Sequence, residues 1–172
     1  MTMQKSISMT TKDPSLISNY YERITCAVQW KEFNRALAAE LTAGLPPEEN
    51  RRLFTRIGER MARNLPIARC DTLAELQSAF NACWERIDWG VGILEETDDH
   101  VSIVHACSPM AMAFGPDSSD WAAGLFEGAY QTWFTAQGIP PDLRVRSETP
   151  PDVATAVAPT RRVHLKLARF SS

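Results

Sequence analysis

Four carboxylates stand close together in the middle of the chain, at Glu95, Glu96, Asp98 and Asp99. A pair of carboxylates is what glycoside hydrolysis requires, one to protonate the leaving group and one to act as base or nucleophile. The acid of such a pair must be buried for its pKa to rise, whereas acids beside a turn are normally solvated. A carbohydrate-active enzyme that uses Glu95 or Glu96 stays open as a hypothesis, but solvated carboxylates are favoured.

A second reactive pair is His105 and Cys107, which lie two residues apart. On a strand this spacing points both side chains to the same face, where they could provide two metal ligands. No third or fourth ligand can be named, and cysteine is so often a core residue that a packed histidine and a buried thiol fit better. We expect no metal and no cofactor. The alternative function is a small-molecule or haem sensor with an apolar pocket and His105 as the ligand.

A third set of functional side chains is a row of arginines on a predicted helix. The row could bind phosphate groups, but acids are interleaved with it, so a solvated or subunit-pairing face is favoured. Motifs for a phosphate loop, a nucleophile elbow, a zinc helix and a dinucleotide site are missing, and we predict a protein that is not an enzyme. The arginines are Arg52, Arg56, Arg60 and Arg63, and the acids are Glu48, Glu49 and Glu59.

The length and charge of the chain bound its fold and its partners. With 172 residues, 44% of them hydrophobic, it is long enough for one domain and too short to expect two. Its formal net charge of -3 disfavours nucleic acid and anionic membranes as partners. No stretch reaches the roughly 20 apolar residues of a membrane span. We predict a flexible arm over residues 1–12 and a single domain over residues 13–170.

The N-terminus and the cysteines indicate a cellular compartment. Residues 1–10 alternate polar and apolar side chains and lack the continuous apolar stretch of a secretion signal. Cys26, Cys70, Cys83 and Cys107 form no Cys-x-x-Cys pair, which argues against a zinc knuckle and against a dithiol redox motif. Reduced and mostly buried thiols are expected. Both observations predict a cytoplasmic protein.

In the first half of the chain, the elements predicted to position these side chains are helices. A helix is predicted over residues 13–44, where apolar side chains recur at three- and four-residue steps. We expect it to bury one broad face. A second helix is predicted over 46–64, with proline at its start and acids in its first turn. A third is predicted over 72–87, and Thr72 with Glu75 forms the capping box that starts it.

The second half of the chain changes to a period of two, which is typical of strands. These strands alternate with loops and with one long aromatic helix. The prediction is an α+β domain in which N-terminal helices and the aromatic helix pack on a short antiparallel sheet. The expected elements are strands near 91–93 and 101–103 joined at Asp98 and Asp99, a loop over 109–117, a helix from Ser118 or Ser119 to about Gln137, strands over 143–147 and 162–169, and a Pro-rich loop between those last strands.

The aromatic helix is apolar on two faces, so it must be buried on two sides. The second neighbour is either its own domain or another subunit, and the two interpretations weigh about equally. Gly124 and Gly128 each cost roughly 1 kcal/mol of helix propensity relative to Ala, which the close approach of another backbone would offset. Our hypothesis for an oligomer interface is Trp121, Gly124, Leu125 and Gly128.

Several short segments form a further pattern through their order along the chain. They are Cys26-x-x-Gln29-Trp30-x-x-Phe33, Arg56-Ile57-Gly58-x-Arg60-Met61-Ala62, Leu65-Pro66, Asn81-x-x-Trp84, Asp88-Trp89-Gly90 and Phe126-Glu127-Gly128-x-Tyr130-x-x-Trp133. Read together, they resemble the cellulose synthase operon protein D family, which provides the D subunit of the bacterial cellulose synthase complex. The resemblance spans about Tyr20 to Val145.

This resemblance implies a non-catalytic accessory subunit that assembles as a ring-like octamer built from dimers. The ring would enclose passages for nascent β-1,4-glucan chains, with N-terminal segments near the lumen, and would help to order the chains into crystalline cellulose microfibrils. It also implies the other cellulose synthase complex subunits and a proline-rich scaffold protein as partners. A scaffold that aligns synthase complexes is the mechanism that fits a cytoplasmic position best.

Direct contact with glucan would fall to the polar N-terminal arm. The hydroxyl groups and backbone of this arm could hydrogen-bond sugar. Stacking of a tryptophan on a sugar ring is the other route, but burial in the core or in an interface is favoured because large aromatics supply most burial energy. The predicted glucan-contact residues are Lys5, Ser6, Ser8 and Thr10.

Overall fold

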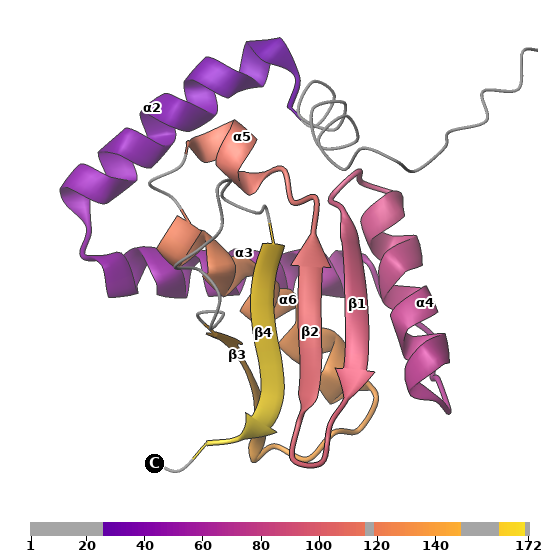
Figure 1. Cartoon of the computed structure of the whole chain (residues 1–172). Coiled ribbons are helices and arrows are strands. Elements are labelled where there is room, and N and C mark those ends of the chain that lie inside the picture. Colours follow the sequence, from indigo (N-terminus) through magenta and orange to yellow (C-terminus); the bar gives the residue numbers. More distant parts are fainter. Residues whose placement is uncertain (1–25, 116–118, 149–161, 171–172) are drawn as a thin grey trace, which may run out of the picture.

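The computed structural model describes residues 26–115, 119–148 and 162–170 (Figure 1). Within these ranges the chain folds into an α+β domain, as predicted from the sequence. The helices are α2 (Val28–Gly44), α3 (Pro47–Asn64), α4 (Leu73–Glu85), α5 (Met110–Phe114) and α6 (Ser119–Ala136), and the strands are β1 (Val91–Glu96), β2 (Val101–Ala106), β3 (Leu143–Glu148) and β4 (Arg162–Arg169).

The four strands form one antiparallel sheet in the order β1-β2-β4-β3. Residues paired across antiparallel strands point to the same face. The pairing of Leu94 with Ile103 and of Ile103 with Leu165 therefore defines a buried inner face. Figure 1 shows α3 and α6 behind this sheet and α4 beside β1. We call the opposite side of the sheet the outer face.

Local signals in the sequence set the start of two helices as predicted. Thr72 and Glu75 form the capping box of α4, in which the Glu75 N–H donates to Thr72 Oγ1 at 3.2 Å and the Thr72 N–H donates to Glu75 Oε2 at 3.3 Å. This pairing satisfies two backbone donors that have no partner within the helix. In α3, Pro47 takes the first helical position, where its missing N–H costs nothing.

The core is a cluster of aromatic rings between α4, α6 and the sheet. Phe80 stacks on Trp133 with ring centroids 5.1 Å apart, and Trp84 meets Trp133 edge-on at 4.9 Å. Both tryptophans are buried, and the Trp133 indole N–H donates to the Leu65 carbonyl at 2.9 Å. Offset and edge-to-face contacts of this kind add roughly 0.5–1.5 kcal/mol each beyond burial. The rings therefore fix α4 and α6 to the same face of the sheet.

Three of the predicted element bounds are wrong. Ala27 is extended, with ψ 134°, so α2 begins at Val28 and the chain does not continue as one helix through residue 27. The predicted loop after Pro109 contains α5, because Pro109 has helical angles and Ser108 Oγ accepts the Met110 N–H at 3.2 Å. The third predicted helix ends at Glu85 instead of residue 87.

The predicted burial of one broad face of the first helix is not found in the part of that helix that the structure describes. Of the side chains of α2, only Ala38 is buried. The start of the predicted helix, residues 13–25, lies outside the described residues, as do the N-terminal arm and the Pro-rich loop. The division into an arm over 1–12 and a domain over 13–170 stays a prediction. Among the helices that the structure describes, none is both long and apolar enough to cross a bilayer.

Candidate functional site

His105 lies at the centre of a buried series of hydrogen bonds on the inner face. Its Nε2 is 2.8 Å from the Trp89 carbonyl, which can only accept, so Nε2 carries the proton. Its Nδ1 is then the acceptor for the Tyr130 hydroxyl at 2.9 Å, and that hydroxyl accepts the Trp84 indole N–H at 3.1 Å. Every polar side-chain group in this series has a partner, which is the condition for burying it at low cost.

Burial keeps these groups neutral. Desolvation lowers the pKa of His105 to about 4, although its hydrogen bond to the Trp89 carbonyl acts in the opposite direction. Desolvation also raises the pKa of Tyr130 well above its usual value, against the smaller effect of the Trp84 N–H. Both ring nitrogens of His105 are occupied inside the core. His105 is therefore a packed histidine, and the haem-ligand role of the alternative function does not fit its geometry.

Cys107 does not share a face with His105 as the sequence predicted. Strand β2 ends at Ala106, and Cys107 has a positive φ of 60°, which turns the chain away from the strand direction. Within the described residues, no group of three histidine, cysteine or acidic side chains is placed to hold a metal ion. The predicted same-face pair fails because alternation holds only while the strand continues.

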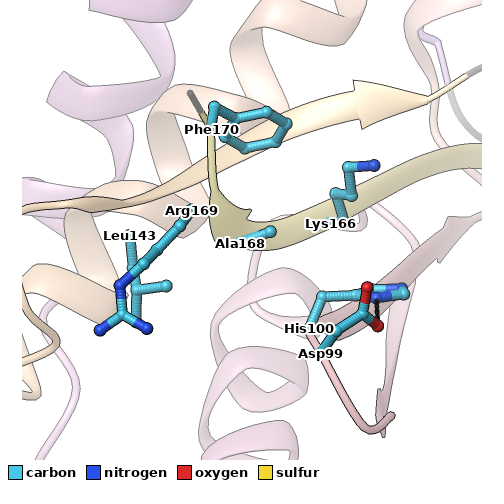
Figure 2. Close-up of a pocket in the computed structure, with 7 residues that line it drawn as sticks. All are labelled: Asp99, His100, Leu143, Lys166, Ala168, Arg169 and Phe170. Atoms are coloured by element: carbon cyan, nitrogen blue, oxygen red, sulfur yellow. Dashed lines mark hydrogen bonds and ion pairs between the residues drawn. The ribbon is translucent and has the colours of Figure 1, made fainter. Parts of the chain in front are cut away.

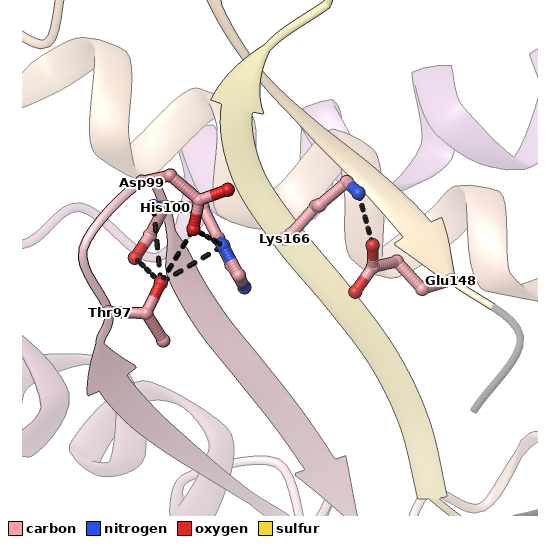
Figure 3. Close-up of polar contacts among 5 residues, drawn as sticks. All are labelled: Thr97, Asp99, His100, Glu148 and Lys166. Atoms are coloured by element: carbon pink, nitrogen blue, oxygen red, sulfur yellow. Dashed lines mark hydrogen bonds and ion pairs between the residues drawn. The ribbon is translucent and has the colours of Figure 1, made fainter. Parts of the chain in front are cut away.

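The predicted carboxylates at the β1–β2 turn are exposed. Thr97 Oγ1 donates to the His100 carbonyl at 2.8 Å, and Asp99 Oδ1 lies 2.7 Å from His100 Nδ1 (Figure 3). The hydrogen bond to His100 lowers the pKa of Asp99, with smaller contributions from the charge of His100 and from Thr97. The group is therefore a closed turn with an ionised carboxylate. It lacks the burial that a general acid of a glycoside hydrolase needs.

A shallow pocket of about 430 Å³ lies between this turn and the end of β4 (Figure 2). Asp99 and His100 line it from the turn, and Phe170 lines it from beyond β4. The Arg146 guanidinium carbon lies 5.0 Å from the centre of the Phe170 ring, and Lys166 Nζ lies 5.6 Å from it. These cations use the ring as a cation–π partner. The pocket is thus part of a charged surface on the outer face of the sheet.

The residues predicted for an oligomer interface pack against α3 of the same chain. A Cβ on Gly128 would lie 2.0 Å from the Thr55 carbonyl oxygen, and one on Gly124 would lie 2.7 Å from the Arg51 carbonyl oxygen. Trp121 and Leu125 are buried. The close backbone approach inferred from the glycines is present, and the backbone is that of α3. A role for these four residues toward a second subunit stays a prediction.

Gly58 of α3 completes this contact from the other side. A Cβ there would lie 1.9 Å from the Leu125 carbonyl oxygen. Glycines on both helices therefore let α3 and α6 touch backbone to backbone. A signal for this contact was present in the sequence, because Gly58 lies in one of the segments that carry the resemblance.

Both edges of the sheet are closed by side chains from the helices. At β1, Asn81 Nδ2 donates to the Gly92 carbonyl at 2.9 Å, and the Gly92 N–H donates to Asn81 Oδ1 at 2.7 Å. At β3, the Val145 N–H donates to Gln131 Oε1 at 2.8 Å. These amides occupy the place of a neighbouring strand, so they hinder pairing with another chain at the edges. Two further bonds of this kind join Leu94 N–H to Gln77 and Ser147 N–H to Glu127.

One exposed apolar surface could not be recognised from the sequence. Trp30, Phe33 and Leu37 recur on one side of α2, and their exposed fractions are 56%, 58% and 38%. Trp30 and Phe33 form an edge-to-face pair with ring centroids 5.9 Å apart. We call these three residues the α2 stripe. The period-3.6 pattern predicted an apolar face correctly, but it could not tell that the described part of the chain leaves this face uncovered.

Comparison with known proteins decides the family. The family model that describes the D subunit of cellulose synthase matches residues 16–159. The chain belongs to this family. It is also similar to the cellulose synthase operon protein D of Komagataeibacter xylinus, with 33% identity over 107 residues, which is 61% of this chain and 69% of that relative. The resemblance noted in the sequence is therefore confirmed.

The segments that carry the resemblance lie mainly in contacts that hold the fold together. Gly58 is at the α3–α6 contact, Trp84 and Trp133 are in the aromatic core, and Asn81 closes the edge of β1. Trp30 and Phe33 differ, because they are exposed. In this member of the operon protein D family, Trp30 and Phe33 are thus large aromatic residues of the pattern that the described part of the chain leaves exposed.

Proposed function

We propose that the chain is a non-catalytic accessory subunit of a bacterial cellulose synthase complex, and that it works as a ring-like homo-oligomer. Membership of the operon protein D family supports the role in cellulose synthesis. The α2 stripe is the observation that carries the proposal of self-assembly. The oligomer would arrange synthase complexes or glucan chains for the formation of crystalline microfibrils.

The α2 stripe has the chemistry of a protein–protein contact. Trp30 and Phe33 are each more than half exposed. Large aromatic residues are among those that contribute most to the binding energy of protein interfaces. Full burial of a fully exposed apolar side chain contributes roughly 1.5–3 kcal/mol. The stripe residues are about half exposed, so a second copy that covers them gains about half of this value for each side chain. Ala38, on the adjacent side of α2, is already buried. A contact at the stripe would then cover two adjacent sides of α2, the one with Ala38 and the one with the stripe.

The non-catalytic role is supported by what occupies the reactive side chains. His105 and Tyr130 bond to each other in the core, and Asp99 bonds to His100 in an exposed turn. Glu95 and Glu96 are exposed on β1. We expect cells that carry Glu95→Gln together with Glu96→Gln to make normal amounts of cellulose. A loss of cellulose, with the protein still folded and the mass of its oligomer unchanged, would favour the carbohydrate-active enzyme.

The further partners follow from the family resemblance. They are the other synthase subunits, a proline-rich scaffold protein and nascent β-1,4-glucan, with Lys5, Ser6, Ser8 and Thr10 as the residues that contact sugar. These four residues lie outside the described part of the chain. The free state of Cys26, Cys70, Cys83 and Cys107 supports a cytoplasmic position, where thiols stay reduced.

Light scattering of the purified full-length chain tests the assembly. We expect a species larger than a dimer at micromolar concentration, and we expect Phe33→Asp to reduce its mass because a buried carboxylate without a partner is costly. Val28→Asp is the matched control. Val28 is 85% exposed on the same helix, and five residues before Phe33 it points to another side of it. A wild-type monomer would overturn the proposal.

The role in cells is tested with the same variants. A strain that carries Phe33→Asp should make cellulose of lower crystallinity by X-ray diffraction, whereas Val28→Asp should behave as wild type. Removal of residues 1–12 separates the glucan contact from the assembly, since it should lower crystallinity without changing the mass of the oligomer. Normal cellulose from the truncated protein would remove Lys5, Ser6, Ser8 and Thr10 as contact residues.

A further inference from the structure

A ring built from dimers needs two different contacts between copies, because a single two-fold contact closes a dimer and goes no further. This inference rests on the proposed self-assembly, in which the α2 stripe forms one contact. We infer that the outer face of the sheet forms the second, by packing on the same face of another copy about a two-fold axis parallel to the strands. The surface is defined by its charges.

Positive charge is collected on the β3–β4 half of the outer face. Arg146 on β3 lies directly across from Lys166 on β4, and Arg144 lies across from Ala168. Like charges opposite each other in a sheet are destabilising. Glu148 pairs with Lys166 (Figure 3). The Phe170 ring partly offsets the charge of both Arg146 and Lys166. Arg144 and Arg146 are exposed, so an additional carboxylate can reach them.

The β1 half of the same face carries the complementary charge. Glu95 pairs with Ser102 of β2, and Ser102 pairs with Lys166. Glu95, Lys166 and Arg146 therefore lie in one row across the sheet, with the acid at one end and the cations at the other. Asp98, in the turn that follows β1, is also exposed. The chain has a formal net charge of -3, so this separation of charge is local to the face.

The row makes the face complementary to itself. A two-fold axis parallel to the strands, between β2 and β4, turns the β1 half of one copy onto the β3–β4 half of the other. Glu95 then lies opposite Arg146 and Lys166 of the second copy, and the reverse pair forms at the other end. Apolar side chains are available beside these charges, because Ile93 is 52% and Val91 is 40% exposed on β1. Apolar contacts with charged pairs around them are the usual anatomy of an interface.

The closed sheet edges direct the contact to the face. Asn81 and Gln131 occupy the backbone groups that a strand from another copy would use at β1 and β3. Extension of the sheet from copy to copy is therefore hindered. Two sheets stacked face to face need no free edge, and they pack about 10 Å apart. The geometry thus leaves face-to-face packing as the way in which two sheets can meet.

The size of the face determines how strong this contact is. Strands of this length and spacing span roughly 20 Å in each direction, which gives about 400 Å² in projection. A stable interface buries about 800 Å² on each partner. The contact is therefore weak alone and gains strength only when the α2 stripe already holds copies together, which raises their effective concentration. Loss of the sheet contact should leave the smaller species that the α2 stripe forms.

Charge reversal followed by mixing is the test, with the full-length chain and light scattering at micromolar concentration. Arg144→Glu with Arg146→Glu makes the β3 side of the face as acidic as its β1 side and leaves Lys166 unchanged, whereas Glu95→Lys with Asp98→Lys makes the β1 side as basic as the β3 side. We expect each double variant to stop at the smaller species. A mixture of the two in equal amounts should recover the mass of the wild type, because each acidic face finds a basic one.

Two controls and a salt series keep the outcomes distinct. Arg69→Glu with Arg86→Glu makes the same change of charge at exposed positions outside α2 and the sheet, and it should assemble as wild type. Circular dichroism must show that each variant is folded, and Arg144→Gln with Arg146→Gln replaces the reversal if it is not. In 1 M salt the Debye length falls to about 3 Å, so the wild type should also shift toward the smaller species.

The results that overturn the inference differ from those that overturn the proposed function. If the wild type is a monomer, self-assembly itself fails, and the sheet contact fails with it. If the wild type assembles and both charge-reversed variants reach the same mass, the outer face is not an interface. If each variant is smaller but the mixture does not recover, the outer face contacts a different surface of another copy, and the face-to-face packing is wrong.

Discussion

Helices α2 and α6 have similar apolar patterns in the sequence and opposite places in the structure. Both carry large aromatic side chains at helical spacing. Tyr130 of α6 is buried, whereas Phe33 of α2 is 58% exposed. In Figure 1, α6 lies behind the sheet next to α3, and α2 lies apart from the sheet beside α5. An apolar pattern therefore predicts that a helix face will be buried. Whether it is buried by other elements of the same chain depends on the rest of the fold.

The glycines explain much of the difference between the two helices. Gly124 and Gly128 of α6 let the backbone of α3 approach, and α3 contributes Gly58 to the same contact. In α2, a Cβ on Gly44 would meet nothing within 4 Å. The first kind of glycine is needed for packing, and the second only ends a helix. A large side chain should therefore lower stability strongly at the first kind of glycine and little at the second.

Gly128→Leu is the change with the largest expected effect. The new Cβ would lie 2.0 Å from the Thr55 carbonyl oxygen, and backbone on both sides cannot move aside without separating α3 from α6. We expect a loss of more than about 4 kcal/mol, which most domains of this size do not survive. Circular dichroism and urea unfolding measure it. The matched control is Gly44→Leu, which should change stability by less than about 1 kcal/mol. Equal stability of both variants would contradict the comparison.

The pH dependence of stability tests the buried hydrogen bonds around His105. Its pKa is lowered to about 4 in the fold, while an unfolded histidine titrates near 6.5. The folded state therefore binds fewer protons, and stability is fully present above pH 6.5 and declines as the pH falls toward 4. A difference of this size corresponds to about 3 kcal/mol. Urea unfolding between pH 7.5 and 4.5 gives the slope.

His105→Gln supplies the control for that slope. The amide cannot titrate, so the variant should be less stable at pH 7.5 but flatter between pH 7.5 and 4.5. Asp99 and Asp142 also have lowered pKa values, from their bonds to His100 and Arg169, and their contribution is lost at the acid end of the range in both proteins. Parallel slopes for the two proteins would show that His105 is not the group that titrates.

The helices and strands could largely be predicted from the sequence, because the patterns that start a helix or mark a strand act over a few residues. The capping box of Thr72 and Glu75 and the alternation in β4 each act over a few residues. The hydrogen bonds from Trp84 through Tyr130 to His105 could not be predicted, because these residues meet only through the fold. The exposure of the α2 stripe was hidden for the same reason. A local pattern marks an apolar face but not its neighbour.

The edges of the sheet, which are closed by helix side chains, differ from the exposed face of α2, and we expect a smaller effect on stability from opening one of them. Asn81→Ala should cost about 1–3 kcal/mol, because the N–H and C=O of Gly92 both lose their partner in a part-buried place. Ser78→Ala is the control on the same helix, since Ser78 bonds only to Ala74 one turn away and is exposed. Thermal unfolding of both variants measures the difference. An exposed edge should also make Asn81→Ala more prone to aggregate.

Phe33→Asp has the smallest expected effect on the fold itself and completes the comparison. Because Phe33 touches water over most of its surface, its replacement should change the stability of the separate protomer by no more than about 0.5 kcal/mol. The wild type should nevertheless melt at a higher temperature as its concentration rises, since association stabilises the folded state by mass action. The melting temperature of Phe33→Asp should depend much less on concentration. If both proteins show the same dependence, copies meet through a surface other than the α2 stripe. If neither shows any, the exposed face of α2 is covered by something other than this chain.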